Sequence, residues 1–298
     1  MNQRILARTG WAISELSFGC MSLQGTDAEN ARLIHKAIDG GINYFDTADL
    51  YQGGANETTV GKALIGKRSE VYIATKVGNE LRADGSGWDW NPRKSYILKA
   101  VDQSLSRLQT DYIDLYQLHG GTIEDPIDEV IEAFEQLKEQ GKIRAYGISS
   151  IRPNVIREYV DRAQIVSNMM QYSLLDRRPE EEALGLLEKN EVGVMVRGAL
   201  AKGYLAGKPV TDYLGYKSQS IDNLIEMMNI FSIEKTNLSH MALQWVLSHQ
   251  AVATAVVGIR TEAQLDDVLA YAEASRLSKD QLSQLSSVLP AFKYEKHR

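Results

Sequence analysis

The stretch "FGCMSLQG" (18–25) decides between two folds that the rest of the sequence leaves open. Short β-branched or aromatic runs alternate with segments of helical period along the chain, which is typical of repeated βα units around a parallel sheet. A doubly wound open sheet and a closed (β/α)8 barrel share this local pattern. An open dinucleotide-binding sheet needs G-x-G-x-x-G after its first strand, and the spacing in this stretch is wrong. The sequence therefore favours the barrel.

Eight strand candidates support this choice, because eight βα units close a barrel. The candidates are 15–19, 42–46, 70–76, 112–119, 143–149, 165–171, 192–197 and 253–258. Segments of helical period, such as 96–108 and 127–141, lie between them, and Gly141 suits a left-handed C-cap. We expect one α/β domain over 1–298, a (β/α)8 TIM barrel with C-terminal helices.

Turn residues predict the parts of the chain outside the barrel units. Two short runs around Thr9-Gly10 predict an N-terminal β-hairpin that plugs the lower end of the barrel. Segments 78–95 and 206–220 are interpreted as two long polar loops. Long loops in a compact barrel often act as lids.

Composition favours a small-molecule partner. The chain has 298 residues, 44% hydrophobic residues and a formal net charge of -6, without a dense run of Lys or Arg. It therefore predicts neither a nucleic-acid nor an anionic-membrane surface. The sequence has no apolar run of signal-peptide or membrane-spanning length, and Cys20 is its single cysteine. We expect a cytoplasmic monomer without an internal disulfide or a metal site, and Cys20 as a packed residue near a strand end.

Polar residues end the second, third and fourth strand candidates: Asp46, Lys76 and His119. In a barrel these ends lie side by side at the C-terminal rim, where barrel enzymes carry their chemistry. A buried Asp46 needs a partner, which Lys76 on the next strand can supply. Tyr51 follows Asp46 by five residues, and we expect it to lean over the pair.

This set of residues predicts a proton donor. A nearby ammonium favours a phenolate, so we expect Lys76 to lower the pKa of Tyr51 by about one to three units. Asp46 would keep Lys76 charged, and His119 could bond the same substrate oxygen. Such donors suit an oxygen on which negative charge develops, as when a carbonyl accepts hydride. Taken singly, each residue could be a turn, surface, rim or strand-end residue, and their joint placement favours catalysis.

Four motifs, in order, carry a resemblance to a known family: "GINYFDTADLYQGGANE" (41–57), "IATK" (73–76), "SLSRLQTDYIDLYQLH" (104–119) and "GISS" (147–150). They resemble the successive signatures of the aldo-keto reductase superfamily. "RGALAKGYL" (197–205) and "GIRTEAQ" (258–264) resemble its bacterial branch that is similar to potassium-channel β subunits. The resemblance implies NADPH bound over the barrel mouth. It also implies a catalytic tetrad of Asp46, Lys76, His119 and the proton donor Tyr51.

The resemblance also implies the cofactor contacts. Ser149, Ser150 and Gln171 would hold the nicotinamide carboxamide. The pyrophosphate would lie on Gly198, Leu200 and Gly203, and the adenosine end near Gly258, Arg260, Gln264 and Asp267. An arginine suits a 2′-phosphate, which favours NADPH over NADH.

Four positions depart from the family pattern. Ser150 replaces a common asparagine, Arg197 replaces a tyrosine that stacks on the nicotinamide, Val257 replaces a proline, and Val268 replaces an asparagine that contacts adenine. We expect a guanidinium contact from Arg197 in place of ring stacking. The segment after Gly203 is short for a covering loop, which predicts fast cofactor exchange.

Three functions from different classes follow. The favoured one is an NADPH-dependent reductase of aldehydes or ketones, with Met21, Trp88 and Trp90 at an apolar pocket mouth for medium-sized aldehydes. The second is a Schiff-base lyase or aldolase with Lys76 as nucleophile, although Asp46 favours the ammonium over the amine. The third is a redox-sensing subunit that binds NADPH and turns over slowly.

Overall fold

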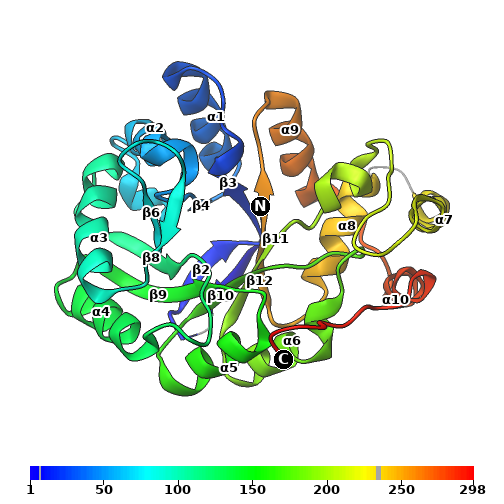
Figure 1. Ribbon diagram of the computed structural model, residues 1–298. Helices are drawn as coiled ribbons and strands as arrows, with labels where there is room; N and C mark the ends of the chain where they lie inside the picture. The colour runs from blue at the N-terminus through cyan, green and yellow to red at the C-terminus, as the bar shows by residue number, and fades with distance from the viewer. Residues whose placement is uncertain (7, 233–235) are drawn as a thin grey trace.

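The repeated βα units form a closed parallel barrel in the computed structural model, which describes residues 1–6, 8–232 and 236–298 (Figure 1). Within these residues the eight barrel strands pair in the order β10-β11-β12-β3-β4-β5-β8-β9. They are β3 (Leu16–Gly19), β4 (Tyr44–Asp46), β5 (Tyr72–Val77), β8 (Ile113–Leu118), β9 (Ile143–Ser149), β10 (Ser167–Gln171), β11 (Gly193–Arg197) and β12 (Val252–Gly258). The predicted TIM barrel is thus confirmed.

Helices cover the outside of the barrel and follow its strands (Figure 1). Gly141 has a φ of +71° just beyond α4, as the predicted C-cap requires. Among the described residues no helix has the length and apolar character needed to cross a membrane. The helices are α1 (Asp27–Asp39), α2 (Ala55–Ala63), α3 (Lys94–Leu108), α4 (Ile127–Glu139), α5 (Pro153–Arg162), α6 (Ala183–Lys189), α7 (Ser218–Phe231), α8 (Leu238–Leu247), α9 (Glu262–Ala270) and α10 (Lys279–Val288).

The predicted hairpin closes the lower end of the barrel. β1 (Gln3–Leu6) and β2 (Trp11–Ser14) pair antiparallel on either side of Thr9-Gly10. Apolar side chains of the hairpin belong to the same buried cluster as side chains of the barrel strands. Burial of this apolar surface is the main term that stabilises the contact between hairpin and barrel. That cluster contains Leu6, Trp11, Ile13, Tyr44, Ala74, Leu115, Ala145, Val166, Met169, Met195 and Ala253.

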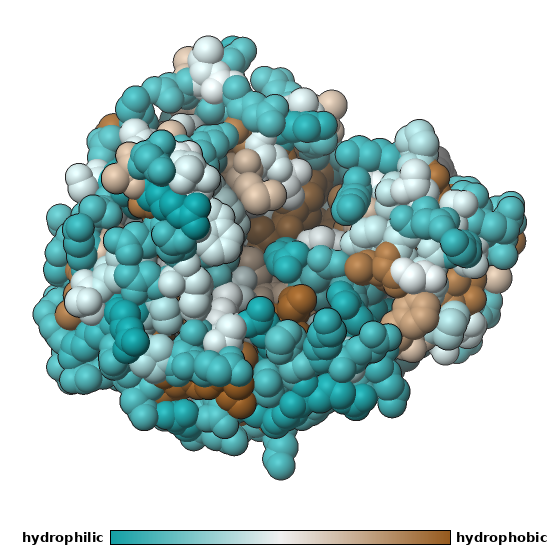
Figure 2. Space-filling view, viewed as in Figure 1, coloured by the Kyte–Doolittle hydropathy of each residue, from teal (hydrophilic) through white to brown (hydrophobic). Residues whose placement is uncertain are grey.

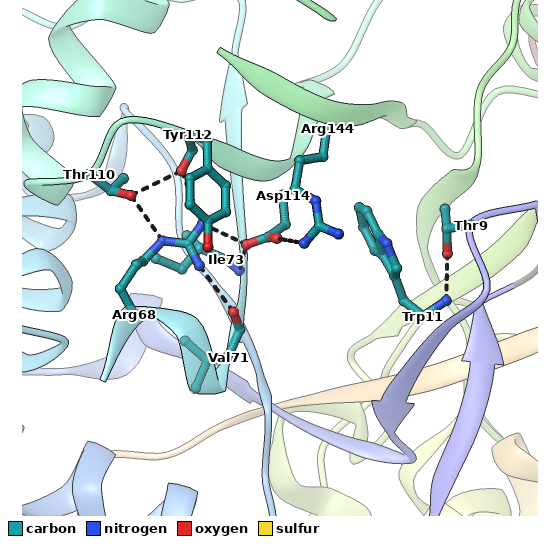
Figure 3. A network of polar contacts seen from close by, with 9 residues as sticks. All are labelled: Thr9, Trp11, Arg68, Val71, Ile73, Thr110, Tyr112, Asp114 and Arg144. Carbon is teal, nitrogen blue, oxygen red and sulfur yellow. Dashed lines mark hydrogen bonds and ion pairs between the residues drawn. The ribbon is translucent and has the colours of Figure 1, made fainter. Parts of the chain in front are cut away.

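A polar network joins the hairpin to the strands of this end (Figure 3). The Asp114 carboxylate on β8 is almost fully buried and accepts hydrogen bonds from Arg68 Nη2 at 2.6 Å, Arg144 Nη1 at 2.7 Å and the Ile73 N–H at 2.9 Å. The Arg144 guanidinium also lies 4.9 Å from the ring centroid of Trp11 on β2. Asp114 therefore connects two arginines, a strand backbone and, through Arg144, the hairpin.

The expectation that 78–95 is a plain loop is wrong. It contains β6 (Asn79–Leu81) and β7 (Trp88–Trp90), which pair antiparallel. Gly85 and Gly87 have positive φ values and allow the connecting turn, and Arg82 pairs with Asp89 across the strands. The other predicted loop agrees better, because residues 207–217 contribute only a bridge between Tyr213 and Tyr216 before α7 begins.

Candidate active site

Strand periodicity places the predicted polar residues at the barrel mouth. Side chains alternate between the two faces of a strand, so residues two positions apart share a face. Tyr44, Ala74, Met169 and Met195 belong to the interior cluster. The residues two positions later, which also lie nearest the carboxyl ends of their strands, are Asp46, Lys76, Gln171 and Arg197.

Lys76 lies at the centre of this group. Its side chain is fully buried, and Nζ donates to Asp46 Oδ1 at 2.6 Å, to the Thr47 carbonyl at 2.7 Å and to the Tyr51 phenolic oxygen at 3.3 Å. Burial alone would lower the pKa of Lys76, but the neighbouring Asp46 and Tyr51 raise it above its ordinary value. Lys76 is therefore an ammonium that joins a carboxylate to a phenol.

The expected lowering of the Tyr51 pKa is wrong. Burial raises the pKa of the phenol above its ordinary value, and the positive charge of Lys76 offsets only part of that effect. The spacing of Tyr51 and Lys76 in the sequence indicates a nearby ammonium but not how far the ring is removed from water. Tyr51 is thus a protonated phenol at neutral pH.

His119 lies beside Tyr51, with ring centroids 5.9 Å apart and the planes at 81°. Burial and the positive charges of Lys76 and Arg197 lower the pKa of His119 to about 3. The imidazole is therefore neutral at physiological pH, and it can donate or accept a hydrogen bond without adding a charge. The structure brings all four predicted catalytic residues, Asp46, Tyr51, Lys76 and His119, into one cluster.

Side chains of α2 hold the loop that carries Tyr51. Thr47 Oγ1 donates to Asn56 Oδ1 at 2.7 Å, and Asn56 Nδ2 donates to the Cys20 carbonyl at 2.9 Å. The neighbouring Glu57 accepts from Thr75 on β5 at 2.6 Å and pairs with Arg107 of α3 at 2.7 Å. No role was predicted for Thr47, Asn56 or Glu57. Cys20 itself is fully buried, as expected.

A cavity of about 350 Å³ lies at the same end of the barrel, between the loop after β11 and the start of α9. It is lined by seven of the residues predicted for the cofactor: Gly198, Leu200, Gly203, Gly258, Arg260, Gln264 and Asp267. A Cβ at Gly258 would lie 2.7 Å from Ser22 Oγ, and Gly203 has a φ of +98°. Gly258 is therefore required by close packing against Ser22, and Gly203 by its left-handed backbone.

Two cationic residues of this cavity were missed by the sequence reasoning: Lys202 and Lys208. Together with Arg260 they give the cavity three positive charges. A cationic, glycine-rich cradle of this kind fits the phosphates of a dinucleotide. Lys202 lies within the 197–205 motif and Lys208 lies just after it. Their positive charge beside the predicted pyrophosphate residues could have identified them as phosphate ligands.

Two of the three predicted nicotinamide residues, Gln171 and Ser150, are already hydrogen-bonded. The Gln171 amide donates to Asp176 at 2.9 Å and Tyr213 at 3.1 Å, and its oxygen accepts from Arg197 at 3.1 Å. The buried Ser150 donates its N–H to Asn168 at 3.1 Å. β9 ends at Ser149, which pairs with Met169 of β10, and Ser150 follows it, so both lie at the rim where β10 ends with Gln171.

The predicted adenosine residues differ in how available their side chains are. The Asp267 carboxylate accepts from Asn237 and Ser239, each at 2.6 Å, and bonds from His240, Ser239 and Asn237 lower its pKa to about 2 despite partial burial. Gln264 Oε1 accepts from the Arg260 N–H at 3.0 Å. The exposed Arg260 guanidinium remains the clearest anion ligand at this end.

The predicted substrate residues are spread around the mouth. The Trp90 indole donates to Asp125 at 2.9 Å, and its ring approaches Gly78 and Gly120, the residue after His119. Trp88 and Met21 are largely exposed, on β7 and in the turn after β3 respectively. Figure 2 shows a hollow over the barrel mouth with hydrophobic residues in its depth and hydrophilic residues on much of its rim. In the described part of the chain no cluster of His, Cys, Asp and Glu is arranged to hold a metal.

Comparisons with known proteins agree with this geometry. Residues 15–290 match the Aldo/keto reductase family. The "Uncharacterized oxidoreductase YqkF" of Bacillus subtilis is 47% identical over 308 residues, covering 100% of both chains. The holo form of "aldo-keto reductase AKR11C1" from Bacillus halodurans superposes with a TM-score of 0.95 at 48% identity, covering 100% of this chain and 99% of that one.

The names of two more distant relatives state different cofactors. The "Aldo-keto reductase yakc [NADP(+)]" of Schizosaccharomyces pombe is 32% identical and covers 65% of this chain and 60% of its own length. The "NADH-specific methylglyoxal reductase" of Escherichia coli is 29% identical and covers 89% of this chain and 91% of its own length.

Proposed function

Because this chain belongs to the aldo/keto reductase family, we propose that it reduces aldehyde or ketone carbonyls with NADPH and that Tyr51 is the proton donor. One observation carries the proposal: the Tyr51 phenol lies 3.3 Å from the Lys76 ammonium, which itself lies 2.6 Å from Asp46. This arrangement suits a phenol that must lose its proton for a moment, because a buried positive charge stabilises the phenolate that forms.

The chain's own residues then have the following roles. NADPH, when bound, supplies a hydride to the carbonyl carbon, and the π electrons of the C=O bond move to oxygen. Tyr51 hydrogen-bonds that oxygen and transfers its proton to it, which completes the alcohol. Lys76 stabilises the resulting phenolate, Asp46 holds Lys76, and neutral His119 hydrogen-bonds the same oxygen. Solvent returns the proton to Tyr51.

We further propose how the cofactor is held. Ser149, Ser150 and Gln171 would bind the nicotinamide carboxamide, with Arg197 beside it. Lys202 and Lys208 would contact the pyrophosphate above Gly198, Leu200 and Gly203. Arg260 would bind the 2′-phosphate near Gly258, Gln264 and Asp267, since a guanidinium matches a phosphate in geometry and charge. The cavity lined by Lys202, Lys208 and Arg260 supports the phosphate part of this assignment.

The burial and charge of Lys76 weigh against the Schiff-base alternative. An amine nucleophile needs a lowered pKa and access to the carbonyl carbon, whereas Lys76 has a raised pKa and no exposed surface. A redox sensor would keep the same residues but turn over slowly. Cytoplasmic location and a monomeric state stay predictions from the sequence.

The proposal is tested by fluorescence titration with NADPH and NADH, followed by steady-state oxidation of NADPH with a panel of aldehydes. We expect tighter binding of NADPH and many turnovers per enzyme. Binding without repeated turnover would favour the sensor, and binding of neither cofactor would contradict the proposal.

A further inference from the structure

A second cavity, of about 650 Å³, lies between the C-terminal tail and the loops after β9 and β10. The tail returns from α10 past α6, and the His297 carbonyl accepts from the Asn154 N–H of α5 (Figure 1). The walls combine apolar and cationic side chains, among them Ile151, Leu214, Phe292, Arg152, Arg178 and Lys296. The proposed chemistry and cofactor contacts leave this cavity unused.

Arg152 connects this cavity to the catalytic cluster. It follows Ser150 at the end of β9, and its Nη1 donates to the carbonyl of Gly121, two residues after His119. No described carboxylate forms an ion pair with Arg152, whereas Arg178 on the same wall is paired with Asp176 at 2.7 Å. Arg152 is thus a cation without an ion-pair partner among the described residues, in a cavity that Glu295 also lines.

Arg197 extends the positive field from the cavity to the reacting groups. Its positive charge helps to lower the pKa of His119. It also offsets part of the rise that burial causes in the pKa values of Tyr51 and Tyr294. It is therefore within electrostatic reach of the catalytic cluster and of the cavity wall, where Tyr294 lies. No carboxylate among residues 1–6, 8–232 and 236–298 pairs with Arg197.

Tyr294 adds an aromatic ring to the wall. Its phenolic oxygen is buried and has no partner among the described residues, and the Arg178 guanidinium lies 4.9 Å from its ring centroid. Tyr294 therefore contributes its ring to the wall, while its phenolic oxygen faces the protein interior.

We propose that the preferred carbonyl substrate carries a carboxylate, which this cavity binds through Arg152 while the carbonyl lies at Tyr51. A single guanidinium matches a carboxylate in charge and in its two-pronged geometry. Arg197 attracts the same group electrostatically, and the apolar walls receive the carbon skeleton. This inference rests on the proposed reductase function and names its substrate class.

The test compares two aldehydes of the same size, 4-carboxybenzaldehyde and the neutral 4-formylbenzamide, with NADPH. We expect kcat/KM to be about tenfold or more higher for the acid, mainly through KM, and the ratio to fall as NaCl is raised. Arg152→Gln should bring the ratio near one, and Arg152→Lys should retain part of it. Arg157→Gln, an exposed arginine of α5, is the control and should leave the ratio unchanged.

The outcomes separate the two proposals. Equal kcat/KM for both aldehydes in the parent enzyme, or an Arg152→Gln loss that is the same for both, would overturn the carboxylate site and leave the reductase intact. A loss shared by both aldehydes would mean that Arg152 only supports the loop through Gly121. Absence of turnover with every aldehyde would contradict the reductase itself.

Discussion

The ammonium of Lys76 lies 3.3 Å from the phenolic oxygen of Tyr51, with no exposed surface on the lysine side chain. The contact lies in the protein interior, where the low local dielectric strengthens the electrostatic interaction between the two groups. Burial favours the neutral phenol and Lys76 favours the phenolate. The balance gives a tyrosine that holds its proton at rest and can release it to a developing alkoxide.

Lys76→Met should therefore abolish most turnover without removing the cofactor site. We expect kcat to fall by about 10²-fold or more, with the Kd of NADPH changed by less than about twofold. Circular dichroism must accompany the kinetics, because the variant leaves the Asp46 carboxylate buried without its partner. Lys62→Met, which breaks an exposed pair with Asp27, is the control. Near-parent kcat in a folded Lys76→Met protein would contradict the assigned role.

The lowered pKa of His119 should make the free energy of unfolding depend on pH. Its pKa is lowered to about 3 in the folded protein, against about 6.5 in an unfolded chain. Between these values the unfolded state binds a proton that the folded state excludes, so stability falls as pH drops below about 6.5. From pH 7 to pH 5 the parent should lose roughly 2 kcal/mol more unfolding free energy than His119→Gln.

Urea unfolding at the two pH values measures this difference. His297→Gln, in the exposed tail, should behave like the parent. Equal pH dependence in the parent and in His119→Gln would show that His119 is not held neutral by burial.

Replacing Asp114, at the end of the barrel opposite the candidate active site, should have a large effect on stability. Asp114→Asn should lower the free energy of unfolding by about 3 kcal/mol, because it leaves Arg68 and Arg144 without their shared, buried carboxylate. Asp27→Asn, which loses only an exposed pair with Lys62, should cost less than about 1 kcal/mol. Thermal and urea unfolding give both numbers, and equal losses would contradict the network in Figure 3.

Arg260 should determine the preference for NADPH over NADH. Arg260→Ala should weaken NADPH binding about tenfold or more and leave NADH binding within about twofold, because only NADPH carries the 2′-phosphate. Fluorescence titration of both cofactors measures this, with the exposed Arg162→Ala as control. A similar loss for both cofactors would remove Arg260 as the phosphate ligand.

Much of the fold could be predicted because periodicity and turn residues are local signals. The eight strands, the hairpin around Thr9-Gly10 and the turn at Gly141 all follow from spacing within a few residues. The rim position of Asp46 and Lys76 followed as well, since neighbouring parallel strands end at the same edge.

The remaining features depend on contacts between distant segments. β6 and β7 were missed because Gly85 and Gly87 interrupt a polar segment whose strands are held by pairs such as Arg82 with Asp89. The raised pKa of Tyr51 depends on burial that no local pattern reports. The second cavity requires the C-terminal tail to meet the loop after β9, which the sequence separates by more than a hundred residues.

The central claim, that Tyr51 is the proton donor, is tested most directly by single-turnover oxidation of NADPH in Tyr51→Phe with a saturating aldehyde. We expect a rate at least about 10²-fold below the parent, an unchanged Kd for NADPH, and a near-parent rate in Tyr112→Phe, whose ring lies under Arg68 at the other end of the barrel. A Tyr51→Phe rate equal to that of the parent would contradict it.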